Sequence, residues 1–213
     1  MKTKDIRKLF KAYVDFYNPE PDEMISLKNV AFEADEPVIF GTPNHKYIES
    51  EILWYESQSR DVRTLFDIYG KEVQIWKQVA DADHKINSNY GWMVFSEENG
   101  NQYLNVLNKL KVDPNTRQAL MIYQRPSMHT EHNRNGMSDF TCCNNVMYYI
   151  DDDELHSIVS FRSNDAIFGY INDRAWMRHI QMALSVDLDI QIGKTHWHAM
   201  DLHIYPRHRD LII

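Results

Sequence analysis

Residues 141–162 have the sequence TCCNNVMYYIDDDELHSIVSFR. Two runs rich in β-branched and aromatic residues, 141–150 and 155–162, flank the acidic run Asp151-Asp152-Asp153-Glu154. Strand-forming residues on both sides of a short polar segment are typical of a β-hairpin. The sequence therefore predicts two neighbouring antiparallel strands. The acidic run is expected to be their solvated turn, because nothing supplies the remaining ligands of a calcium loop.

Further strands and helices are expected on both sides of this hairpin. Strand character is found at 28–41 (with a turn), 119–123 and 195–205. Apolar residues recur at helical spacing over 4–17, 45–57, 61–68, 73–80, 101–111 and 166–184. Thr3 is expected to cap the first helix. We see no internal repeat or domain boundary, so residues 1–213 are expected to form one α+β domain with a mostly antiparallel or mixed sheet packed by helices.

Composition and charge restrict the class of protein. The chain has 213 residues, of which 43% are apolar and 25% charged, as in ordinary soluble domains. No apolar run approaches the length of a membrane span, and the first residues lack a signal-peptide core, so we expect a cytoplasmic protein. The net charge of −8 argues against broad binding to nucleic acid but permits a locally basic site for a small anion.

The chain has two cysteines, Cys142 and Cys143, and they are adjacent. Adjacent cysteines seldom form a structural disulfide, because the bridge strains the intervening peptide, and a reducing compartment is therefore expected. The pair is interpreted either as two small buried apolar residues or as a nucleophile and its neighbour. A positive charge lowers the pKa of a thiol. Arg162 would supply that charge to Cys142 if the two predicted strands are neighbours.

Arg162-Ser163-Asn164-Asp165 directly follows the second strand of the hairpin and precedes the long helix at 166–184. An arginine fork and a serine hydroxyl suit a phosphate monoester, and the free N–H groups at a helix start favour anions. The alternative is a surface arginine beside a turn-forming serine. The spacing from Cys142 strengthens the interpretation as an anion site.

Two carboxylates lie on apolar helical faces. Asp173 stands three residues before Trp176, and Glu51 stands three residues before Trp54. Each is either paired inside the protein or functional, because a buried carboxylate needs a partner. A carboxyl group at Asp173 can accept from the amino group of cytosine and stabilise a proton on ring nitrogen 3, whereas uracil suits an amide. Desolvation of Glu51 would raise its pKa and permit proton transfer near neutral pH.

The histidines near the C-terminal end suggest two further interpretations. His196 and His198 share a strand face, but no cysteine or second cluster lies at a standard zinc spacing, so no metal is expected. His203 and Tyr205 also share a face, and both can donate to a sugar hydroxyl.

Taken together, these residues resemble the thymidylate synthase superfamily. The resemblance rests on Cys142, Arg162 to Asp165, Glu51 within Ser50-Glu51-Ile52-Leu53-Trp54, and His203-Ile204-Tyr205. Further blocks that look shared are 34–41, 86–92, 121–123, 125–128 and 136–140. The resemblance covers residues 30–208, and it is greatest to the branch, found in T-even phages, whose members hydroxymethylate deoxycytidylate.

The resemblance implies a thymidylate synthase-like fold and a homodimer whose sheets pack back to back. It implies a pyrimidine nucleoside monophosphate as substrate, dCMP here, and methylenetetrahydrofolate as the one-carbon donor, with no metal. By position, the catalytic residues are Cys142, Glu51 and Asp173. The implied substrate-binding residues are Arg162, Ser163, Asn164, Arg117 (reaching the partner's phosphate), Arg125, His203 and Tyr205. The implied folate-binding residues are Trp76, Tyr90 and Asp165.

The mechanism that the resemblance implies begins with addition of the Cys142 thiolate to carbon 6 of cytosine. Asp173 stabilises the electron-rich ring, carbon 5 takes the one-carbon unit, and water completes the hydroxymethyl group with Glu51 ordering water or moving protons. In a synthase the folate would instead deliver hydride.

One departure from the family pattern and several alternatives remain. Gln118 stands where the family usually has a second arginine, for which Arg125 is a candidate replacement. The same reaction on CMP, thymidylate synthesis from dUMP, and a catalytically idle member that binds nucleotide or RNA are the alternatives to dCMP hydroxymethylation.

Overall fold

The computed structural model describes residues 1–212, which form one mixed six-stranded sheet. Its main strands lie in the order β1 (Ile25–Glu33), β6 (Gln191–Ile204), β4 (Glu154–Phe161), β3 (Cys143–Asp151) and β2 (Leu120–Ile122), and the short β5 (Asn164–Asp165) pairs with β6. Strand β6 is parallel to β4 and β5, and the other pairs are antiparallel. The prediction of an α+β protein with a mixed sheet is confirmed.

The hairpin predicted at residues 141–162 is formed by β3 and β4. Asp151 pairs with Glu154, and the two residues between them have positive φ angles of 48° and 58°. Aspartate tolerates this left-handed conformation better than most residues, and tight hairpin turns require it. At the other end of the hairpin the backbone N–H of Arg162 donates to the carbonyl of Cys142 at 2.9 Å. The hairpin therefore places these two residues side by side.

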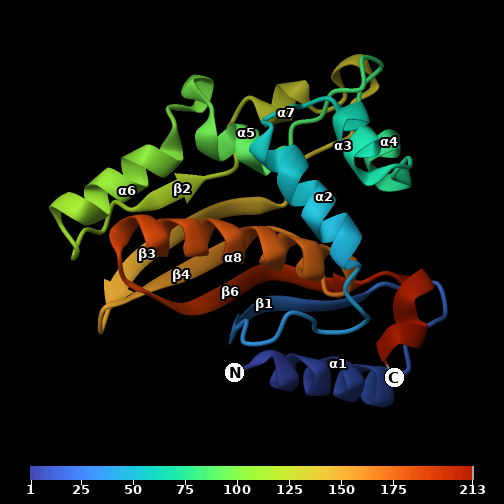
Figure 1. The fold of residues 1–213 in the computed structure, drawn as a ribbon. Coiled ribbons are helices and arrows are strands. Elements are labelled where there is room, and N and C mark those ends of the chain that lie inside the picture. The colour runs from blue at the N-terminus through green and yellow to red at the C-terminus, as the bar shows by residue number, and fades with distance from the viewer. Residues whose placement is uncertain (213) are drawn as a thin grey trace.

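Helices pack on one side of the sheet and along its edges, as Figure 1 shows. Helix α8 (Phe168–Leu188) connects the parallel strands β4 and β6 and packs on both, while α1 (Thr3–Tyr17) lies beside β1 and α6 (Gln102–Val112) beside β2. The other helices are α2 (His45–Glu56), α3 (Val62–Tyr69), α4 (Gln74–Val79), α5 (Tyr90–Phe95), α7 (Met128–Glu131) and the short 3₁₀ helices η1 (Glu97–Asn99), η2 (Arg134–Gly136) and η3 (Pro206–Ile212). All six helical ranges expected from the sequence are confirmed, with shifted ends.

Alternation along the strands determines which face of the sheet meets α8. In β4 the side chains of Leu155, Val159 and Phe161 are fully buried, and Ile158 between them is exposed. Trp176 and Ile180 of α8 are fully buried, as the sequence predicts. Buried apolar side chains thus recur every two residues in the strand and every three to four in the helix, as packing between a sheet and a helix requires.

The strand expected over residues 28–41 was predicted too long. Strand β1 ends at Glu33, and Val38 and Ile39 lie in a loop. The Arg7 side chain donates to the carbonyls of both residues, at 2.9 and 2.6 Å, and so replaces strand neighbours as their partner. Thr3 is likewise not the cap of α1, because the helix begins at Thr3 and its preceding residue is the cap.

Helix α5 is not among the elements predicted from the sequence. It is buried on all sides, so it lacks the one-sided apolar pattern of a surface helix. Its start is fixed by the Asn89 side chain, which accepts the N–H of Trp92 at 2.7 Å. Gly91 lies against α2 so closely that a Cβ atom there would stand 1.7 Å from the Tyr55 carbonyl oxygen. This glycine allows Tyr90 to pack directly on Tyr55, at a ring distance of 5.3 Å.

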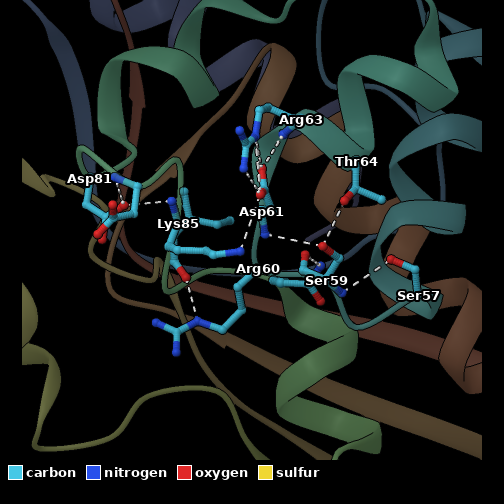
Figure 2. Close-up of polar contacts among 11 residues, drawn as sticks. Ser57, Ser59, Arg60, Asp61, Arg63, Thr64, Asp81 and Lys85 are labelled. Atoms are coloured by element: carbon cyan, nitrogen blue, oxygen red, sulfur yellow. Dashed lines mark hydrogen bonds and ion pairs between the residues drawn. The ribbon is translucent and has the colours of Figure 1, made fainter.

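The segment that joins α2 to α3 is tied to residues 81–87 by charged side chains. Figure 2 shows Asp61 receiving hydrogen bonds from Arg63 and Lys85, and the pKa of Asp61 is lowered by the hydrogen bond from Arg63 above all. Arg60 donates to the carbonyl of Ile86 at 2.8 Å. These contacts hold the end of α2 against the segment that leads into α5.

Within residues 1–212, no helix is long and apolar enough to cross a membrane. The cytoplasmic location and the single-domain organisation of the whole chain stay predictions.

Candidate active site

The Cys142 thiol lies next to the Arg162 guanidinium. The distance from Arg162 Nη2 to Cys142 Sγ is 3.7 Å. The guanidinium is held in place by two carbonyls of the cysteine's own segment: Nη2 donates to Phe140 at 2.6 Å, and Nε donates to Thr141 at 3.0 Å. The guanidinium carbon also lies 4.9 Å from the centre of the Phe140 ring. The predicted proximity of the two side chains is therefore present.

The protonation of Cys142 differs from the expectation that Arg162 lowers its pKa. Burial raises the pKa of the thiol to about 11, although the positive charge of Arg162 acts in the opposite direction. Desolvation is the larger effect because the thiolate loses its water shell. At neutral pH roughly one thiol in ten thousand is ionised, so attack by Cys142 requires a proton acceptor or a change in its surroundings.

A buried carboxylate fixes the segment that carries the cysteine. Asp139 accepts the backbone N–H groups of Asn87 and Ser88 at 2.7 and 2.6 Å and the Ser88 hydroxyl at 2.7 Å. The Ser88 hydroxyl lies 3.1 Å from that of Thr141, the residue before the cysteine. Sequence patterns do not predict this network, because the partners are about fifty residues apart and only the fold joins them.

Asp173 lies in α8 and is partly buried, and its charge acts to raise the pKa of the nearby Cys142 thiol. Burial raises its pKa well above the ordinary value, and the charge of Glu51 adds to the rise. Its Oδ2 accepts a hydrogen bond of 2.8 Å from Asn164 Nδ2. The carboxyl group therefore carries a proton over a wider pH range than an exposed aspartate does.

Glu51 lies in α2, and its burial is as predicted. Its Oε1 accepts hydrogen bonds from the Tyr47 hydroxyl at 2.5 Å and from Trp76 Nε1 at 3.3 Å. Burial raises the pKa of Glu51 to about 7, against the opposing effect of these two hydrogen bonds. A carboxyl group of this kind exchanges protons near neutral pH. Tyr47 was not predicted, although its position one helical turn before Glu51 is a usable sequence signal.

Electrostatic effects show that these groups lie near one another. The pKa of Tyr90 is raised by burial and then by the charges of Asp173 and the two cysteines. The pKa of Tyr205 is raised by burial, then by Asp165 and Cys142. We use the name Cys142 cluster for Cys142, Arg162, Asp173, Glu51 and Tyr90.

Two other predicted residues border the Cys142 cluster. The His203 ring is buried and stands edge-on to Tyr205 at 4.9 Å, and its Nδ1 has no hydrogen-bond partner within residues 1–212. Asp165 accepts the backbone N–H groups of Ile167, Phe168 and Gly169 at the start of α8. Its carboxylate thus supports the helix that carries Asp173.

Two predicted arginines lie outside the Cys142 cluster. Arg117 is exposed in the loop before β2, and its side chain makes no hydrogen bond or ion pair within the described residues. Arg125 donates to Asn87 Oδ1 at 3.0 Å and to Glu131 at 2.5 Å, and its guanidinium lies over the Trp92 ring at 5.0 Å. Arg125 therefore joins the segment before α5 to α7.

The histidines of β6 do not gather into a larger cluster. His198 Nε2 lies 2.9 Å from Asn29 Oδ1, and His196 stands 6.5 Å from the His156 ring. Across residues 1–212, no group of three or more His, Cys, Asp or Glu side chains is placed to hold a metal ion. That the protein needs no metal stays a prediction.

Comparison with known proteins identifies the family. A family model described as thymidylate synthase matches residues 41–213. The chain therefore belongs to the thymidylate synthase family, as the resemblance of its motifs suggests. Thymidylate synthase A from Bacillus subtilis has a similar structure, with a TM-score of 0.75 over 99% of this chain and 82% of that one. At 22% identity, this likeness confirms the fold alone.

Curated relatives fall into two groups. The chain is 43% identical to the deoxycytidylate 5-hydroxymethyltransferase of Enterobacteria phage T4 over 195 residues, which cover 88% of this chain and 78% of the relative. It is 29% identical to the thymidylate synthase of Francisella philomiragia over 168 residues, which cover 74% of this chain and 60% of the relative. The higher identity to the phage enzyme agrees with the branch that the motifs indicate.

The high pKa of Cys142 predicts a distinctive pH dependence of alkylation. The rate of its reaction with iodoacetamide should keep rising with pH to about 11. Arg162→Gln should slow the reaction at every lower pH, because it removes the charge that favours the thiolate. Peptide mass spectrometry identifies the modified residue, and Cys143→Ala serves as the control. A plateau already reached by pH 9 would contradict the account.

Burial of Glu51 predicts a pH-dependent gain in stability for Glu51→Gln. Its pKa of about 7 exceeds the ordinary 4.5, so its contribution to stability is fully present below pH 4.5 and is lost as pH rises through 7. A glutamine keeps an acceptor and cannot ionise. The unfolding free energy of the variant minus that of the wild type should therefore rise by about 3 kcal/mol between pH 4.5 and pH 8.

Denaturant unfolding of Glu51→Gln at the two pH values provides this measurement. Glu49→Gln is the matched control, because Glu49 is exposed on the same helix. Equal stability differences at both pH values for Glu51→Gln would show that Glu51 ionises as freely in the folded chain as in the unfolded one.

Proposed function

We propose that the chain is a deoxycytidylate 5-hydroxymethyltransferase. It would transfer a one-carbon unit from methylenetetrahydrofolate to carbon 5 of dCMP, through a covalent adduct between Cys142 and the pyrimidine, with water completing 5-hydroxymethyl-dCMP. The observation that carries the proposal is Asp173, a partly buried carboxyl group with a raised pKa near the Cys142 thiol. The 43% identity to the phage T4 enzyme supports the same reaction.

The Arg162 side chain has two roles in this proposal. Its Nε and Nη2 are bonded to the carbonyls of Thr141 and Phe140, which leaves Nη1 to donate to a phosphate oxygen. Ser163 adds a hydroxyl donor on the next residue, and His203 and Tyr205 supply donors to the sugar hydroxyl. Because the same guanidinium lies 3.7 Å from Cys142 Sγ, anchoring the phosphate also places the base near the thiol.

The buried carboxyl groups would handle the protons. Asp173 pairs with the amino group and ring nitrogen 3 of cytosine and stabilises negative charge that develops on the ring after the thiol adds to carbon 6. Glu51, with a pKa of about 7, holds or moves a proton for the water that completes the product. Tyr47 and Trp76 fix the position of Glu51 through their hydrogen bonds.

The residues present fit a folate. When bound, the folate supplies the one-carbon unit. Trp76 is half-buried, with its N–H held by Tyr47 at 2.9 Å and its ring edge-on to Trp54. Phe168 at the start of α8 is 47% exposed, although it is a large apolar side chain. Such aromatic surfaces suit a flat ring system, and the resemblance to the family assigns Tyr90 and Asp165 to the folate as well.

The protein would act as a homodimer joined through the sheet. On the face opposite α8, β-pairing aligns Leu120, Met147, Ile158 and His196 in one row and Ile122, Asn145, Ser160 and His198 in the next. Leu120, Ile122 and Ile158 are exposed in the single chain. Exposed apolar residues on a sheet face suit a second copy related by two-fold symmetry. Arg117, free of contacts in its own chain as far as residues 1–212 go, would reach the partner's phosphate site.

Turnover measurements test the proposed reaction. Purified protein is incubated with methylenetetrahydrofolate and dCMP, CMP or dUMP carrying tritium at carbon 5, and products are identified by mass spectrometry. We expect tritium release and a hydroxymethyl product from dCMP, and Cys142→Ser should abolish release while nucleotide binding remains. A methyl product from dUMP would identify a thymidylate synthase instead. Binding without release from any nucleotide would identify an idle family member.

Mixing two inactive variants tests the dimer. Arg117→Ala lacks the arginine reaching the partner, and Cys142→Ser lacks the nucleophile. After the mixture is unfolded and refolded together, a mixed dimer contains one site with both residues intact. Activity should recover to about one quarter of the wild-type value, because half of the dimers are mixed and each has one complete site. No recovery, with both variants folded, would show that Arg117 does not act across subunits.

A further inference from the structure

Asp173 stands at the end of a short chain of hydrogen bonds. Trp197 Nε1 donates to Asn164 Oδ1 at 3.2 Å, and Asn164 Nδ2 donates to Asp173 Oδ2 at 2.8 Å. Trp197 and Asn164 are buried, with 1% and 2% of their surfaces exposed. All three residues belong to elements that meet at the edge of the Cys142 cluster: β6, β5 and α8.

The direction of this chain is fixed by the tryptophan. An indole N–H is a donor and has no acceptor, so it must face the amide oxygen of Asn164. The amide nitrogen then has to face Asp173, and it can only donate. Asp173 Oδ2 is therefore compelled to be an acceptor. If the carboxyl group carries a proton, the proton must lie on Oδ1.

The position of that proton decides which pyrimidine fits. A protonated carboxyl group offers one donor and one acceptor, and it can match either base in one of two orientations. To bind cytosine, the protein must donate to ring nitrogen 3 and accept from the amino group. To bind uracil, the protein must accept from the N–H at nitrogen 3 and donate to oxygen 4. A carboxyl group whose proton is free to move between its oxygens would accept both bases.

We propose that the Trp197–Asn164 hydrogen-bond chain makes Asp173 specific for cytosine by holding its proton on Oδ1. Oδ1–H then faces ring nitrogen 3, and Oδ2 accepts from both the cytosine amino group and Asn164. Uracil is rejected because its N–H would meet the Oδ1 proton and its oxygen 4 would meet an acceptor. Asn164 is thus a positioning residue rather than a ligand of the phosphate. This inference rests on the proposed function.

The surroundings keep the chain in one geometry. The Trp197 ring stacks on Phe161 at 4.8 Å and meets Tyr170 edge-on at 5.1 Å, so the indole cannot turn away. Asn164 is paired to Leu202 in the sheet. Gly169 packs beside the contact: a Cβ there would stand 3.1 Å from Asp165 Cβ and in ordinary van der Waals contact with Asn164 and Asp173. Burial and the nearby Glu51 charge raise the pKa of Asp173, which favours the protonated form.

Two variants break the Trp197–Asn164 hydrogen-bond chain at different bonds. Trp197→Phe keeps an aromatic ring and removes only the indole donor, so the Asn164 amide is free to rotate. Asn164→Ala removes the donor to Asp173 itself. In both, the ratio of kcat/KM for dCMP to that for dUMP, measured by tritium release from carbon 5, should fall about tenfold or more, the size of a hydrogen bond to an ionisable group. Kd values for the two nucleotides give the same ratio without turnover.

Trp54→Phe is the matched control for the loss of indole volume. Trp54 is fully buried, and its Nε1 has no hydrogen-bond partner within residues 1–212. The variant should lower thermal stability as Trp197→Phe does but leave the dCMP to dUMP ratio unchanged. Asp173→Asn should shift the ratio of kcat/KM furthest toward dUMP, because the amide that it introduces should favour uracil.

Three outcomes are decisive. A fall in the ratio for Trp197→Phe and Asn164→Ala, with an unchanged ratio for Trp54→Phe, supports the inference. Equal losses with both nucleotides in the folded variants, while the wild-type protein prefers dCMP, overturn the hydrogen-bond chain and leave the proposed function standing. A folded wild-type protein that neither releases tritium from dCMP nor prefers to bind it overturns both.

Discussion

Desolvation of three ionisable side chains is the constraint on which this site depends. Cys142 directly precedes β3, while Glu51 lies in α2 and Asp173 in α8. Burial raises the pKa of all three, although Cys142 and Asp173 keep part of their surface exposed. Desolvation therefore favours the neutral form of each group, and Glu51, with a pKa of about 7, is near its midpoint at neutral pH. Neutral groups can lie close together where three charges could not, and they become charged only as a reaction proceeds.

The fold supports these groups by giving each a fixed partner. Tyr47 and Trp76 hold Glu51, Asn164 holds Asp173, and Arg162 stands beside Cys142. The partners in turn are hydrogen-bonded to their surroundings. Arg162 donates to two carbonyls of the segment that carries the cysteine, and Asp139 of that segment accepts from Ser88. Such preorganisation lowers stability locally, because buried polar groups are costly, but it fixes the geometry that catalysis needs.

Particular local placements of the fold and of the candidate site could be predicted from the sequence. The hairpin at 141–162 follows from strand propensity around an acidic turn, and it alone places Arg162 beside Cys142. The burial of Glu51 and the partial burial of Asp173 follow from helical spacing. Pattern reasoning did not find α5, which is apolar on all sides, or the loop at Val38 and Ile39, whose carbonyls are satisfied by a distant arginine. The net pKa of Cys142 also depends on the depth of burial, which spacing does not give.

A crystal structure of the protein with dCMP bound tests the central claim most directly. The account predicts the phosphate on Arg162 and Ser163, carbon 6 of cytosine facing Cys142 Sγ, and both carboxyl oxygens of Asp173 against the base, with Oδ1 at ring nitrogen 3 and Oδ2 at the amino group. A complex in which the phosphate lies elsewhere, or in which the cytosine edge faces away from Asp173, would contradict it.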